Sequence, residues 1–193
     1  SYELPMCFVL LSVVCLASSM NLTDITIAQM SKNAIFGWFF IPCFLGFLIM
    51  FVCIISELNR CPFDLPEAES ELVCGYNTEY SGMKFAMFFL GEYANFFISS
   101  MLLVVLFLGG FSSPFGFYLS KLLFKDFSWL NYIVQIEEVF WLFFKTFLVI
   151  FLSIWIRATL PRMKADSIIK FCFKFLLPLA LINLFVIVLI KFA

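Results

Sequence analysis

The most acidic stretch of this sequence is a polar loop at residues 58–82. Arg60 stands near its start, and Glu57 closes the apolar run before it. Pro66 favours the first turn of a helix, so residues 66–74 are predicted to form a short surface helix with acids at the positive end of its dipole. Clustered like charges beside lipid favour proton uptake, which predicts proton exchange here; the alternative is an ordinary solvated loop. The remaining acids in the cluster are Asp64, Glu67, Glu69 and Glu71.

Ionisable side chains also occur within the apolar segments. Glu92 shares one helical face with Asn95 and Ser99. A charge at this depth costs about 2.5–3.5 kcal/mol on insertion scales, so the stripe is predicted to face protein or water rather than lipid. Glu3 and Glu57 lie at the ends of the first two apolar segments, on the same predicted membrane side. Glu3, Glu57 and Glu92 are therefore predicted to form a proton path that leads inward from the loop.

A second polar face is predicted around Lys145, which lies inside the fourth apolar segment. Thr146, Ser153 and Arg157 continue that face at helical spacing. One alternative gives these residues no functional role: Glu92 and Lys145 would form a buried ion pair that only fixes helix packing.

The composition is typical of an integral membrane protein. Of the 193 residues, 64% are hydrophobic and 13% are charged, against about 45–50% and about 25% in soluble domains. The net charge is −1, which does not favour a nucleic-acid partner. There is no His, and none of the seven Cys forms a C-x-x-C pair. We therefore expect no metal site and no disulfide.

The sequence predicts an all-α integral membrane protein, with residues 1–193 as a single membrane domain. A membrane-spanning helix needs about 20 mostly apolar residues, and about five segments qualify. Lys and Arg are in excess, seven against four, on the side that holds the N-terminus, the 58–82 loop and the 161–174 loop, and this places the 58–82 loop on the matrix or cytoplasmic side. The predicted helices are at residues 4–20, 34–56, 83–110, 139–160 and 169–192.

A family resemblance covers nearly the whole chain. Residues 57–80 read ELNRCPFDLPEAESELVCGYNTEY, and the resemblance extends through Ser1–Glu3, FLGEY at 89–93 and WIRATLPR at 155–162. These motifs resemble subunit 1 of mitochondrial NADH:ubiquinone oxidoreductase, respiratory complex I. The match at 57–80 is long and specific, so chance is a poor explanation for it.

The resemblance implies roles for the acidic and basic residues. In that family the loop lines the inner part of a ubiquinone chamber. Glu3, Glu57 and Glu92 match carboxylates of the proton path, and Arg157 and Arg162 match the basic end of the next-to-last helix. The residues that match the chamber loop, and are expected to bind the substrate, are Arg60, Asp64, Glu67, Glu69 and Glu71.

The chain also departs from the family. Ala68 stands where the family usually has Gly, and Lys164, Ala165, Ser167 and Ile168 differ from the usual residues after Pro161–Arg162. The family has about eight membrane helices, and this chain matches the last five. We expect a split gene, with a companion chain that carries the missing N-terminal helices.

The expected function is that of a membrane subunit of a proton-pumping NADH:ubiquinone oxidoreductase in the mitochondrial inner membrane. The resemblance implies no cofactor on this chain, ubiquinone as the substrate, and FMN and iron–sulfur clusters on partner subunits. Expected partners also include quinone-reducing matrix-arm subunits, small membrane-arm subunits and lipid. The alternatives are a membrane subunit of a related hydrogenase, a carboxylate-based secondary transporter, which would show an inverted repeat, and a purely structural anchor.

Overall fold

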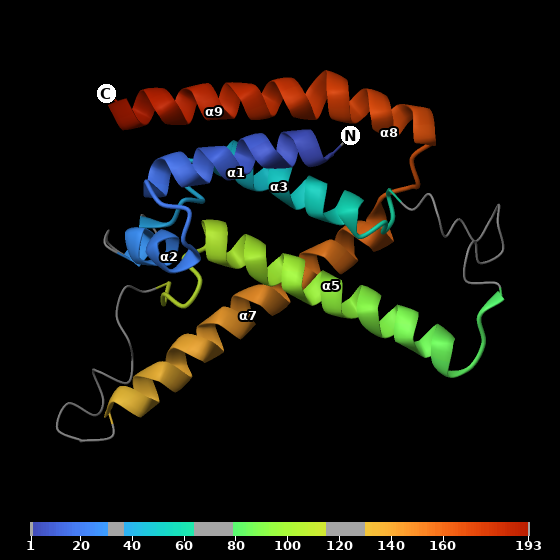
Figure 1. Ribbon diagram of the computed structural model, residues 1–193, viewed down its shortest axis with the longest axis horizontal. Helices are drawn as coiled ribbons and strands as arrows, with labels where there is room; N and C mark the ends of the chain where they lie inside the picture. Colours follow the sequence, from blue (N-terminus) through green and yellow to red (C-terminus); the bar gives the residue numbers. More distant parts are fainter. Residues whose placement is uncertain (1, 31–36, 64–78, 115–129, 193) are drawn as a thin grey trace.

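The computed structural model describes residues 2–30, 37–63, 79–114 and 130–192 (Figure 1). All regular elements within these ranges are helical, which confirms the predicted all-α membrane class. Along the chain they are α1 (Glu3–Ala17), α2 (Leu22–Met30), α3 (Phe44–Glu57), α5 (Met83–Phe107), α7 (Leu130–Thr159), α8 (Ala165–Phe171), a π-helical turn η3 (Cys172–Leu176) and α9 (Leu177–Phe192).

Within the described ranges, three stretches are long and apolar enough to cross a membrane: Met83–Phe107, Ile133–Thr159 and Ser167–Phe192. They correspond to the last three predicted spans. The first predicted span is shorter than expected, because α1 ends at Ala17 and Ser18 adopts a left-handed conformation with a φ of 58°. Taken with α2, which is bent from α1 by 58°, it makes a fourth candidate span.

The second predicted span, 34–56, differs most from the structure. Its helix begins only at Phe44 and has 14 residues, while residues 34–36 lie outside the described ranges. Pro42 explains the late start: a proline has no backbone N–H, and it disfavours helical geometry at the residue before it, Ile41. The apolar run was long enough for a span, but it is not one continuous helix.

The helices form two layers (Figure 1). Helices α1, α3 and α9 pack against one another in one layer, and α5 and α7 cross in the other, with contacts from α2 and α3 to α5. A buried polar cluster fastens the first layer: the Asn183 side-chain amide of α9 donates to Ser12 Oγ of α1 at 3.2 Å and to Cys43 Sγ at 3.3 Å. Gly46 makes this approach possible, because a Cβ there would overlap Cys43 Sγ.

The C-terminal span runs through α8, η3 and α9 and buries one face throughout. The buried side chains recur at intervals of three or four residues: Ile168, Cys172, Leu176, Ala180, Asn183 and Ile187. The π-helical turn therefore lies within a continuous packed surface.

Candidate functional site

The candidate site is built around the turn that follows α3. The helix ends at Glu57, and Asn59 then takes a left-handed conformation with a φ of 49°, which Asn tolerates better than most residues. The Phe63 N–H donates to the Arg60 carbonyl at 2.8 Å and closes the turn. As a result the Arg60 side chain projects from the end of α3 toward α5.

Arg60 binds an intramembrane carboxylate. Its Nη2 lies 3.0 Å from Glu92 Oε1 on α5, with the two side chains 13% and 25% exposed. The guanidinium also stands over two rings of α5, 4.8 Å from the Tyr93 centroid and 5.3 Å from that of Phe96. A charge-assisted bond supported by cation–π contacts holds this pair firmly. The structure thus joins the start of the predicted acidic loop to the predicted proton path.

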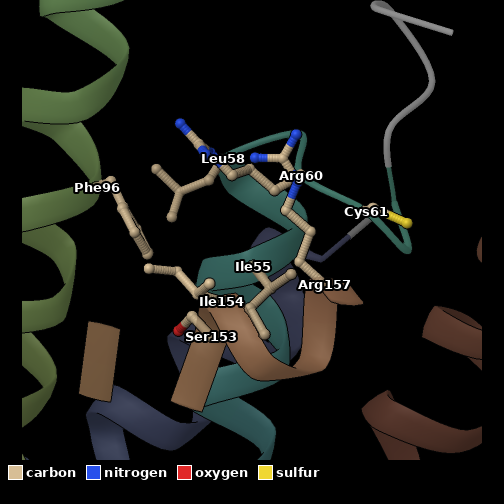
Figure 2. Close-up of a pocket in the computed structure, with 8 residues that line it drawn as sticks. All are labelled: Ile55, Leu58, Arg60, Cys61, Phe96, Ser153, Ile154 and Arg157. Carbon is tan, nitrogen blue, oxygen red and sulfur yellow. The ribbon is translucent and has the colours of Figure 1, made fainter. Parts of the chain in front are cut away.

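A small pocket opens beside this ion pair (Figure 2). Arg157 reaches up from α7 toward the turn that carries Arg60, so two guanidinium groups serve one site. Arg60 Nε is buried and has no hydrogen-bond partner among the described residues. Such a site attracts negative charge. The pocket is lined by Ile55, Leu58, Arg60, Cys61, Phe96, Ser153, Ile154 and Arg157.

Two further contacts fasten the turn to the end of α7. Cys61 Sγ donates to the Leu160 carbonyl at 3.7 Å, and the Met163 N–H donates to the Pro62 carbonyl at 3.0 Å. The turn is therefore held by α7 on one side and by Glu92 of α5 on the other. A change in the charge of Glu92 would act on a segment that is fixed at its other edge.

Glu3 and Glu57 come together at a different point. Glu3 opens α1 and Glu57 closes α3, at neighbouring ends of these packed helices (Figure 1). Burial raises the pKa of the Tyr2 phenol, and the nearby carboxylates of Glu57 and then Glu3 raise that pKa further. Both acids therefore lie close to one side chain. Among the described residues neither forms an ion pair, unlike Glu92.

Apart from Glu92, the polar stripe predicted on α5 does not pack into the described core. Asn95 is exposed, and Ser99 Oγ donates to the Asn95 carbonyl of its own helix. The outer side of the first turns of α5 is also exposed, with Met83 at 80%, Met87 at 65% and Leu90 at 68%. A face that mixes amide, hydroxyl and apolar groups in this way suits a protein neighbour better than lipid.

Lys145 contradicts the alternative in which it pairs with Glu92. Its Nζ donates to the carbonyls of Leu108 at 2.7 Å, Gly110 at 3.1 Å and Ser112 at 2.6 Å. Glu92 meanwhile binds Arg60. The carbonyls beyond the end of α5 have no helical partner, and they supply the acceptors that the spacing of charges could not reveal.

Sequence reasoning located some of these residues and missed others. The described ranges include four of the predicted site residues: Arg60, Glu92, Glu57 and Glu3. They exclude the predicted 66–74 helix and the other acids of the loop, which are Asp64, Glu67, Glu69 and Glu71. Arg157 was not predicted as a site residue, although its helical spacing from Ser153 was a usable signal. Within the described ranges the cysteines are free, and no group of three His, Cys, Asp or Glu is arranged to hold a metal ion.

Comparisons with known proteins agree with this picture. The family model for NADH dehydrogenase matches residues 1–188. The chain is 43% identical over 191 residues to an NADH-quinone oxidoreductase subunit of Anoxybacillus flavithermus, covering 99% of this chain and 51% of that protein. It is 42% identical over 187 residues to NADH-ubiquinone oxidoreductase chain 1 of Chondrus crispus, covering 97% and 52%.

A third relative, the NADH-quinone oxidoreductase subunit of Rhodospirillum rubrum, is 43% identical over 182 residues, which is 94% of this chain and 49% of that protein. The chain thus spans about half the length of the curated relatives that it matches. The family model nevertheless extends over almost all of it. On these matches, this chain belongs to the NADH dehydrogenase family.

Proposed function

We propose that this chain is part of the membrane subunit of a proton-translocating NADH:ubiquinone oxidoreductase, where it forms one wall of the ubiquinone chamber and the carboxylate path beside it. The observation that carries the proposal is the Arg60–Glu92 ion pair, because it joins a residue of the chamber loop to a carboxylate in the membrane. Arg157 at the same pocket adds a second cation that would favour negative charge on the quinone or on the loop.

The proposed mechanism works through charge pairing. Partner subunits would supply the electrons that reduce ubiquinone, and the loop would respond to the new charge through five residues: Arg60, Asp64, Glu67, Glu69 and Glu71. When Arg60 turns toward the reduced quinone, Glu92 loses its counter-charge, and a carboxylate in an apolar setting then favours proton uptake. When Arg60 returns, the proton is released toward the membrane arm. Glu57 and Glu3 take part as neighbouring carriers at the ends of α3 and α1.

The proposal assigns the redox groups to partners. FMN and iron–sulfur clusters belong to other subunits, and ubiquinone is the substrate that this chain helps to bind. The loop faces the mitochondrial matrix, where the quinone-reducing subunits dock, and lipid and small membrane-arm subunits cover the remaining surface.

The half of the relatives' length that this chain does not match completes the subunit. Its position is proposed along the outer side of α5, where Asn95 and the apolar side chains of the first turns are exposed. In the assembled complex this side of α5 is then covered by protein.

The test replaces three carboxylates by amides of the same shape: Asp64→Asn, Glu57→Gln and Glu92→Gln. In the assembled complex each is expected to lower ubiquinone reduction and proton pumping about tenfold, a demand of about 1.4 kcal/mol on one carboxylate. Electron transfer from NADH to a hydrophilic artificial acceptor should continue, because that reaction uses the flavin arm alone.

The matched control is Asp24→Asn, an exposed carboxylate that only binds Ser19 Oγ among the described residues. It should leave all three activities unchanged. Normal pumping and normal ubiquinone reduction in the three amide variants would reject the carboxylate path and leave the acidic loop as a solvated structural feature.

A further inference from the structure

The C-terminal end of α5 has an unusually complete set of hydrogen bonds. A helix leaves its last carbonyls without partners. Here the Val104 carbonyl accepts from Leu108, and the Phe107 carbonyl accepts from the Phe40 N–H at 3.0 Å. The side-chain amide of Gln29 donates to the Val105 and Leu106 carbonyls at 3.1 and 3.2 Å. The next carbonyl, that of Leu108, accepts from Lys145.

Lys145 occupies a cage of backbone carbonyls. The Leu108, Gly110 and Ser112 oxygens converge on its Nζ, and three acceptors match the three N–H groups of an ammonium ion. A neutral amine would leave one of these carbonyls without a donor. The Trp38 ring lies 4.3 Å from Nζ and adds a cation–π contact. The cage therefore suits a positive charge, and among the described residues no carboxylate pairs with it.

Such a cage would attract other cations if Lys145 were absent. Converging carbonyls at the negative end of a helix dipole are the groups that coordinate hydrated protons and metal cations. Buried polar groups continue from the cage toward α2, since Gln29 Oε1 accepts from the Gly109 N–H at 2.8 Å. The Trp38 indole N–H donates to Ser112 Oγ at 3.0 Å. The C-terminal end of α5 therefore has buried hydrogen-bonding groups of the kind that could conduct protons.

The cage is at the C-terminal end of α5, whereas the Arg60–Glu92 pair lies in the N-terminal half of this helix. Leu108 follows Glu92 by 16 positions, which corresponds to about 24 Å along a helix. Between them α5 carries fully buried apolar side chains, Leu103 and Val104 among them. A leak across the membrane would need to pass both this apolar section and the cage.

We propose that Lys145 is a tethered cation that fills the carbonyl cage at the end of α5 and so prevents passive proton leakage through this subunit. A covalently attached ammonium cannot leave the cage, and its charge repels a hydrated proton that approaches from either side. Pumped protons are then kept from returning by this route. The role concerns the seal of the membrane and does not depend on how the quinone end works.

The test compares four complexes reconstituted in proteoliposomes: Lys145→Met, Lys145→Gln, Lys145→Arg and the native protein. A potassium diffusion potential set by valinomycin drives protons without NADH, and a trapped pH dye reports their entry. The two neutral variants should leak protons several times faster than the native complex. The Arg variant should match the native complex because it keeps the charge.

A neighbouring buried residue supplies the matched control. Thr146 Oγ1 donates to the Leu142 carbonyl of its own helix, so Thr146→Val removes a buried polar group without touching the cage. It should not leak. With NADH and ubiquinone present, the neutral Lys145 variants should keep their electron-transfer rate while building a smaller proton gradient. This readout separates a seal from the quinone site, whose failure would lower electron transfer itself.

Two results would overturn the proposal. One is a native leak rate in assembled Lys145→Met and Lys145→Gln complexes. The other is failure of both neutral variants to assemble while Lys145→Arg assembles, which would assign the lysine to folding alone. Lys145→Gln keeps two N–H donors for the carbonyls and is the neutral variant expected to assemble most readily.

Discussion

Arg60 and Lys145 both reach α5 from neighbouring segments, Arg60 in its N-terminal half and Lys145 at its C-terminal end, and they are bound there in different ways. Arg60 meets a carboxylate, Glu92, whose charge can change with its protonation state. Lys145 meets three backbone carbonyls, whose dipoles cannot change. A cation held by a titratable acid can be released, whereas one held by the backbone is part of the fold. The difference suits a working end and a sealed end on a single helix.

The packing around Lys145 and near Glu92 also differs. Around Lys145 the turn is closely packed: a Cβ at Gly109 would lie 2.7 Å from Trp38 Nε1, and Gly109 itself has a φ of 71°. Next to Glu92, the face of the helix that carries Gly91 is open, because a Cβ at Gly91 would meet nothing within 4 Å. The two glycines therefore differ in the space that an added side chain would find.

The largest effect is expected from Gly109→Ala. The left-handed backbone costs a non-glycine residue about 1–3 kcal/mol, and overlap with Trp38 and Ser112 adds a further ~1–3 kcal/mol. The amount of assembled complex on native gels should fall, and the surviving complex should lose activity at a lower temperature. Native assembly and heat resistance in this variant would mean that the cage end is as loose as the Glu92 end.

An intermediate effect is expected at the working end, from a double-mutant cycle on Arg60→Gln and Glu92→Gln. A charged hydrogen bond is worth about 1.5–3 kcal/mol, so the double variant should be more stable than the sum of the single effects predicts. The dissociation temperature of the assembled complex measures this in all four combinations. Asp24→Asn combined with Glu92→Gln is the distant pair, which should be additive. If the effects of Arg60→Gln and Glu92→Gln on the dissociation temperature were additive, the ion pair would not distinguish this part of α5 from the Lys145 cage.

The smallest effect is expected from Gly91→Ala. Alanine stabilises a helix interior by about 0.5–1 kcal/mol relative to glycine, and the structure provides space for its methyl group. Assembly and dissociation temperature should stay unchanged or rise slightly. Loss of assembly would instead show that another protein segment packs closely against this turn, which would sharpen the description of this face of α5.

The sequence predicted the parts of this structure that depend on local pattern. Hydropathy located the three spans at 83–110, 139–160 and 169–192, and spacing put Glu92 on a polar face. It did not predict the partners of the two cations. Pairing Arg60 with Glu92 depends on how α3 packs on α5, and capping α5 with Lys145 depends on the Gly109–Gly110 turn. Neither arrangement leaves a periodic signal.

The second predicted span shows a different limit. The apolar content of residues 34–56 satisfied the length rule, but Pro42 delayed the helix to Phe44. The roles of Asp64, Glu67, Glu69 and Glu71 rest on resemblance alone, since these residues fall outside the described ranges. The sequence alone predicted some of the residues that belong to the site. Which of their side chains contact each other depends on how the helices pack.

The π-helical turn η3 sets the rotation of the C-terminal span. In an α-helix every fourth residue leads the previous one by about 40°, so a row at 168, 172, 176 and 180 would drift around the helix. The wider π turn at Cys172–Leu176 offsets that drift and keeps Ile168 and Ala180 in one line. The number of residues per turn in η3 therefore determines the rotation of α9 relative to α8. If the same residues formed a regular α-helix, α9 would be rotated relative to α8, and Asn183 would be carried away from Ser12 and Cys43.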